Sequence, residues 1–192
     1  MKFDEQALAS ALSGLGGEDQ AAFAALCAER LLPLIADQRS AELGAAALDC
    51  LWRRLGGEPI AAAATSRLAE SIEAAVPDED AGDWSQETAF TKNALAAVAY
   101  SLRCLERHDP RYAVWAARQT IETLDLMATT RHNIDPNASG YEDAVLADPA
   151  LQRELRRQHE DLEALSKGHD TRELSRLREQ AQHEARTFLE AA

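Results

Sequence analysis

Apolar residues recur at intervals of three and four positions along almost the whole chain, and no segment shows the strict alternation of a half-buried β-strand. This spacing places the apolar side chains on one face of an α-helix. The composition agrees, because alanine, leucine, glutamate, glutamine and arginine are abundant and β-branched residues are scarce. We therefore predict an all-α protein, a compact bundle of about seven or eight helices that ends in a C-terminal helical hairpin.

Capping residues mark the ends of the predicted helices. An aspartate before a proline, or with a glutamate or glutamine three residues later, is typical of a helix start, because its carboxylate accepts hydrogen bonds from free backbone N–H groups. Such starts occur at Asp83, Asp109, Asp148 and Asp170. Helix ends are predicted at the glycines of positions 16–17, 56–57 and 168, which can adopt the left-handed conformation.

The predicted buried faces lie between these marks, after a short leading helix around residues 4–12. The faces run from Phe23 to Ile35, Gly44 to Leu55, Ala61 to Ile72, Phe90 to Leu105, Val114 to Ala128, Leu151 to Leu165 and Leu174 to Leu189. A chain of this length can bury one core of its own. We predict a single helical domain over residues 1–192, with a subdivision near 134–147 as the alternative, because that connection is rich in turn-forming residues.

The charge of the chain limits its partners. It carries 33 acidic and 20 basic side chains, which gives a net charge of −13 at pH 7. Nucleic acids and anionic membranes are also negatively charged, so we expect neither as a partner. The first residues are acidic where a secretory signal would be basic, and the three cysteines are widely spaced without a Cys-x-x-Cys. These features favour a cytoplasmic protein.

The motifs of common catalytic and metal sites are missing from the sequence. None of the five histidines has a carboxylate three residues before it, as the di-iron sites of helical bundles require. The acidic segment 78–83 departs from a calcium-binding loop at two required positions. We expect no catalytic residue, no metal and no cofactor, and we interpret Cys27, Cys50 and Cys104 as inert thiols.

Pro33 is the most informative single residue. It falls inside a predicted helix that otherwise continues from Glu18 to Asp37, where it cannot donate to the carbonyl of Glu29. We therefore expect a kink in this helix. Either the bend wraps the helix around the core, or it opens a polar notch at Glu29 and Arg30 that takes a ligand or a partner.

Several short motifs follow one another in a defined order. They are Phe23-x-x-Leu26-Cys27-Ala28-Glu29-Arg30-Leu31-x-Pro33, Leu48-Asp49-x-Leu51-Trp52, Pro77-Asp78, Asp83-Trp84, Ala113-Val114-x-x-Ala117 with Thr120 and Thr123, and Asp148-Pro149-Ala150-Leu151-x-x-Glu154. In this order they resemble the YjaG-like bacterial family, domain-of-unknown-function family 416, over nearly the whole chain.

The resemblance implies an all-helical cytoplasmic bacterial protein and supplies no activity and no catalytic residues. The positions at which the chain matches the family signature become the candidate site residues. They are Glu29, Arg30, Pro33, Asp49 and Trp52.

Two classes of function remain open. The first is a non-enzymatic helical protein that binds another protein or a second copy of itself, most simply as a homodimer. Helices 90–105 and 112–128 carry small and apolar residues on more than one face, which favours this class. The second is a small-ligand-binding protein or an enzyme with a polar pocket near Glu29, Arg30 and Asp49.

Overall fold

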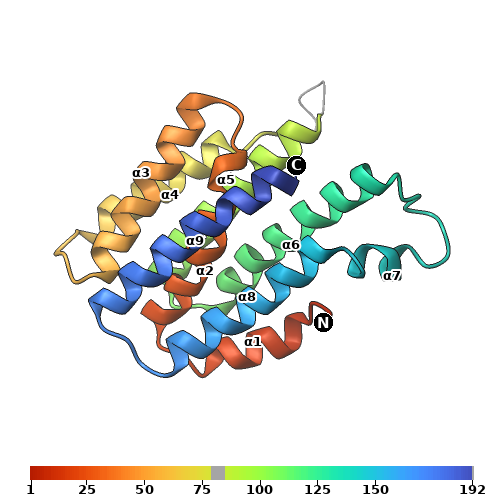
Figure 1. Cartoon of the computed structure of the whole chain (residues 1–192). Coiled ribbons are helices and arrows are strands. Elements are labelled where there is room, and N and C mark those ends of the chain that lie inside the picture. The colour runs from red at the N-terminus through yellow and green to blue at the C-terminus, as the bar shows by residue number, and fades with distance from the viewer. Residues whose placement is uncertain (79–84, 192) are drawn as a thin grey trace.

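The structure, a computed structural model, describes residues 1–78 and 85–191. Within these residues the chain forms α-helices and one short 3-10 helix without any strand, which confirms the all-α prediction (Figure 1). The elements are α1 (Glu5–Ser13), α2 (Gly17–Leu31), η1 (Leu32–Leu34), α3 (Gln38–Leu55), α4 (Ala62–Ala75), α5 (Gln86–Arg107), α6 (Pro110–His132), α7 (Tyr141–Leu146), α8 (Pro149–Ser166) and α9 (Thr171–Ala191).

Helix α2 runs through the middle of the bundle. Each residue from Gln20 to Leu31 is buried, so the helix has no exposed face after its first turn. Helices α3, α5, α6, α8 and α9 all contact it (Figure 1). Its alanines leave room for these neighbours to approach closely, which is why one helix can be covered from so many directions.

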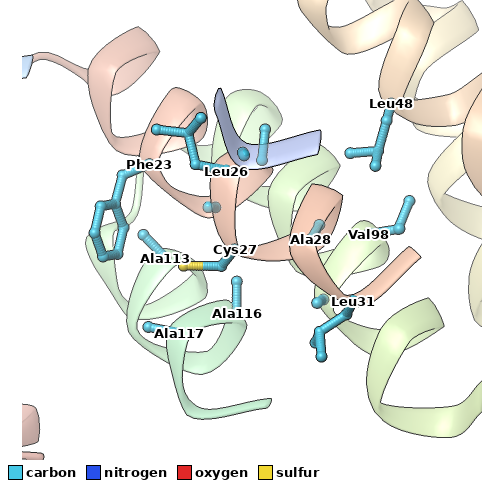
Figure 2. Packing of buried hydrophobic residues seen from close by; sticks show 14 of the residues in the cluster. Phe23, Leu26, Cys27, Ala28, Leu31, Leu48, Val98, Ala113, Ala116 and Ala117 are labelled. Carbon is cyan, nitrogen blue, oxygen red and sulfur yellow. The ribbon is translucent and has the colours of Figure 1, made fainter. Parts of the chain in front are cut away.

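The core around α2 combines large side chains of this helix with small ones of α6. Figure 2 shows Phe23 and Cys27 of α2 beside Ala113, Ala116 and Ala117 of α6, all of them buried. Among the residues that the structure describes, nearly all of the apolar faces predicted from the sequence are buried or partly buried. The side chain of Leu189 lies outside the described part of the chain.

The predicted helix starts are confirmed at three of four positions. Asp109, Asp148 and Asp170 each accept hydrogen bonds from backbone N–H groups of the first turn. Asp83 lies outside the described residues, and α5 is capped instead by Ser85, whose hydroxyl accepts from the N–H of Thr88 at 3.1 Å.

The predicted helix ends are confirmed in part. Gly57 and Gly168 have φ of 89° and 78°, in the left-handed region that favours glycine. Gly16 differs, because it has an extended conformation and begins α2 rather than ending α1.

The expected kink at Pro33 is wrong. Helix α2 ends at Leu31, and Pro33 occupies the second position of η1, where a missing N–H is tolerated. The chain therefore turns out of the helix at the proline instead of bending and continuing. No polar notch opens at Glu29 and Arg30, both of which are buried.

The C-terminal hairpin is present. Helices α8 and α9 lie side by side, joined by a short turn at residues 167–170, and both pack on α2 (Figure 1). The connection at 132–147 contains one short helix, α7, that the sequence did not predict. Val145 of this helix belongs to the same hydrophobic cluster as α2, and a single domain over 1–192 stays our prediction.

We expect Pro33→Ala to lower the free energy of unfolding by about 0.4–1 kcal/mol. The native conformation suits proline, so alanine mainly adds freedom to the unfolded chain. In a helix interior the same substitution would stabilise by about 3 kcal/mol. Urea unfolding followed by circular dichroism separates the two cases by sign, and a gain in stability would contradict the turn described above.

Candidate functional site

Arg30 is a fully buried arginine between α2 and the C-terminal hairpin. Its Nη2 donates to Glu154 Oε1 at 3.0 Å and its Nη1 to Asp161 Oδ2 at 2.8 Å. Its Nε lies 3.0 Å from Glu154 Oε2, an ion pair whose angles do not fit a hydrogen bond. Glu184 Oε2 lies 3.9 Å from Nη1 and, with its other oxygen, 3.1 Å from Arg157 Nε. We call these five residues the Arg30 cluster.

The Arg30 cluster holds more negative than positive charge. Its two arginines face three carboxylates, of which Glu154 is fully buried and Asp161 and Glu184 are 8% exposed. Burial raises the pKa of the Asp161 carboxyl, although its bond to Arg30 acts in the opposite direction. Protonation of Asp161 would therefore remove the excess negative charge of the cluster.

Arg178 of α9 organises a second group of polar residues. Its Nε donates to Glu29 Oε1 at 2.8 Å and its Nη1 to Asp49 Oδ1 at 3.3 Å. Glu29 also accepts from Trp52 Nε1 at 2.9 Å and from Gln182 Nε2 at 3.2 Å. The Arg178 guanidinium carbon lies 5.9 Å from the centre of the Trp52 ring, within reach of a cation–π contact. We call these five residues the Arg178 site.

The structure divides the predicted site residues between the two groups. Glu29 and Arg30 are neighbours in sequence, but Arg30 contacts α8 and α9 while Glu29 contacts α3 and a different part of α9. Asp49 and Trp52 join Glu29. Pro33 is exposed in η1 and belongs to neither group.

Glu29, Arg30 and Asp49 do not line one common pocket, contrary to what the sequence predicts. Arg30 is 0% exposed and Glu29 2%, so neither is open to a ligand. A groove of about 300 Å³ does lie beside Glu29, between the end of α3 and the start of α9. Trp52 and Arg178 line it, and both donate a hydrogen bond to the buried Glu29.

The residues that sequence reasoning missed lie on α8 and α9. Glu154 and Asp161 occupy the same face of α8 as Leu151, Leu155 and Leu165, at spacings of three and four. Carboxylates on the apolar face of a helix signal a buried partner, because an ionised group is rarely buried without one. The signal was present, but the partner arginine lies more than a hundred positions earlier.

A third feature lies on the surface formed by α5 and α6. Trp115 packs edge-on against Tyr112, with ring centres 5.2 Å apart, and lies 5.5 Å from Tyr100. Its exposed fraction is 38%, and among the described residues the other large exposed hydrophobic side chain is Met1. We call Tyr100, Tyr112 and Trp115 the aromatic surface.

The described residues contain little that resembles reactive chemistry. No group of three or more histidine, cysteine, aspartate or glutamate side chains in this part of the chain could hold a metal ion. Burial raises the pKa of the Cys27 thiol strongly and that of Cys104 to about 12, so both stay protonated at neutral pH. None of the helices in residues 1–78 and 85–191 has the length and hydropathy needed to cross a membrane.

Comparison with known proteins gives a family and a fold. The sequence matches the family described as "Protein of unknown function (DUF416)" over residues 7–188. It is similar in structure to a DUF416 family protein from Shewanella baltica OS155, with a TM-score of 0.76 and 16% sequence identity over 91% of this chain and 92% of that one. No curated protein matches the sequence.

We expect Arg30→Met to lower the free energy of unfolding by about 3–5 kcal/mol, because methionine leaves the carboxylates of the Arg30 cluster buried without their cation. The matched control is Arg176→Met, an exposed arginine on α9 paired with Glu173, which we expect to change stability little. Chemical unfolding of both variants measures the difference. Equal losses would show that the buried charge is not what holds the hairpin.

Asp161→Asn tests the excess charge in the same cluster. Asparagine can still accept from Arg30 but cannot ionise. Because the pKa of Asp161 is raised in the folded protein, the folded state keeps this proton to a higher pH than the unfolded chain does. The wild type therefore loses stability as the pH rises above about 3.9, the ordinary pKa of aspartate. The loss is complete once the pH exceeds the pKa of Asp161 in the folded state. The variant does not have this loss, so its stability relative to wild type should increase with pH. Unfolding curves between pH 4 and pH 8 measure it, and a relative decrease would contradict the assignment.

Proposed function

We propose that this chain, which belongs to the DUF416 family, is a non-enzymatic binding protein that pairs with a second copy of itself. The family carries no assigned reaction, so the proposal rests on the surface of the molecule. The pairing surface that we assign is the aromatic surface on α5 and α6.

The exposure of Trp115 is the observation that carries this proposal. A tryptophan that is 38% exposed and is held between two tyrosines presents a large apolar side chain in one orientation. Because its rings are already packed, little side-chain freedom is lost when a partner covers it. Tryptophan and tyrosine are also the residue types that most often dominate binding energy at protein interfaces.

The same surface carries a hollow next to this projecting ring. The hollow has a volume of about 270 Å³ and is lined by Tyr100, Trp115, Arg118, Gln119 and Glu122. In a two-fold dimer each copy presents the same patch, so a projection beside a hollow can meet its own counterpart. A second copy is thus a partner whose shape suits this surface.

The charges around the hollow also suit a second copy. Arg118 pairs with Glu122 at 2.7 Å and with Glu5 at 3.2 Å, so both signs occur at this edge. Two copies related by a two-fold axis can place the arginine of one opposite the glutamates of the other. The net charge of −13 opposes association only weakly here, because salt screens charges that lie far from the contact.

The buried alanines of α5 are not part of the contact that we propose between copies. Ala94, Ala97 and Ala99 are buried within the subunit, where they allow close packing of neighbouring helices.

The cytoplasm is the compartment that we propose for this protein. The free thiols of Cys27, Cys50 and Cys104 support it, because disulfides are rare there.

We expect Trp115→Ser to convert the dimer to monomer while leaving the fold intact. Sedimentation equilibrium at tens of micromolar should give twice 21.0 kDa for the wild type and 21.0 kDa for the variant. The matched control is Ile60→Ser, which removes a half-exposed apolar side chain away from the aromatic surface and should stay dimeric. A monomeric wild type, or a dimeric Trp115→Ser, would refute the proposal.

A further inference from the structure

We propose that the groove between the end of α3 and the start of α9 binds a small zwitterion of the amino-acid class. The carboxylate of the ligand would lie against Arg178 and its ammonium group against the carboxylates on the α3 side. This proposal is independent of pairing through the aromatic surface.

The groove is built from two segments that are far apart in the sequence. Trp52, Arg53, Gly56 and Glu58 line one side, and Thr171, Leu174, Ser175 and Arg178 line the other. Its volume of about 300 Å³ is at the lower end of the range for small-molecule sites, which suits a ligand of few atoms.

Arg178 is held in a fixed orientation at this groove. Glu29 and Asp49 engage its Nε and Nη1, and the ring of Trp52 lies alongside. Within the described residues, its remaining nitrogen, Nη2, takes part in none of the hydrogen bonds or ion pairs. The side chain is 25% exposed, so this nitrogen belongs to a partly desolvated, pre-oriented cation. Such a group suits a carboxylate, because little freedom is lost on binding.

The charges around the groove favour a zwitterion over a simple anion. The cations are Arg178 and Arg53, and the carboxylates are Glu29, Asp49 and Glu58. Three negative groups against two positive ones repel a phosphate dianion. A ligand with one charge of each sign adds no net charge. It offers an ammonium group to Glu58 in the lining of the groove or to Asp49 beside Arg178, both of which are accessible to solvent.

The groove also has room for an apolar substituent. The indole of Trp52 and the side chain of Leu174 are apolar groups in its lining, while Thr171 and Ser175 are exposed on α9. An amino acid with an apolar side chain can therefore place its charged end at Arg178 and its side chain against the ring.

The experiment is isothermal titration calorimetry of the full chain with L-leucine, isovalerate, isopentylamine and inorganic phosphate as separate probes. We expect L-leucine to bind once per chain, the two single-charge probes at least tenfold more weakly, and phosphate not at all. Failure of L-leucine to bind, or stronger binding of phosphate, would overturn the proposal.

Two variants locate the binding. Arg178→Gln should abolish L-leucine binding, and Arg176→Gln, a change of the same type outside the groove, should leave it unchanged. Because Arg178 also supports Glu29, a second variant leaves the polar contacts intact: Ser175→Leu fills the groove from an exposed position on α9 and should also abolish binding. Wild-type affinity in Ser175→Leu with an unchanged far-ultraviolet spectrum would show that the site lies elsewhere.

Discussion

The buried charge of Arg30 is the constraint on which the rest of the structure depends. A guanidinium in the interior is tolerated only where carboxylates meet it, and here they come from α8 and α9. The C-terminal hairpin therefore has one position on α2 at which the charges are paired. Apolar contacts alone would allow such a hairpin to slide or rotate along its stripe, so the ion pairs supply register as well as attraction.

Glu29 gives the hairpin a second fixed point, about 100° around the axis of α2 from Arg30. Its carboxylate connects the indole of α3 with the guanidinium of α9. Two neighbouring charges on one buried helix thus hold both helices of the hairpin. On α8 they contact residues 154 and 161, and on α9 they contact residues 178, 182 and 184. Helices α5 and α6 pack on another side of α2, where buried alanines set the spacing.

The fold could be predicted from the sequence because its signals are local. The stripe from Phe90 to Leu105 and the caps at Asp109 and Asp148 depend on residues a few positions apart, and the structure confirms them. Pro33 misled the prediction, because a proline that ends a helix and one that bends it produce the same local pattern. The partners of Glu29 and Arg30 could not be predicted, since nothing local links α2 to residues 154, 161 or 178.

The enclosure of α2 has a consequence for the chain as it is synthesised. The hydrogen-bond partners of Arg30 lie 124 and 131 positions later, so a growing chain carries this charge unpaired until its last helices have left the ribosome. Contacts so distant in sequence close late and slow folding. A chain that stops before α8 presents an uncompensated cation among apolar side chains, and it remains open to proteases and chaperones.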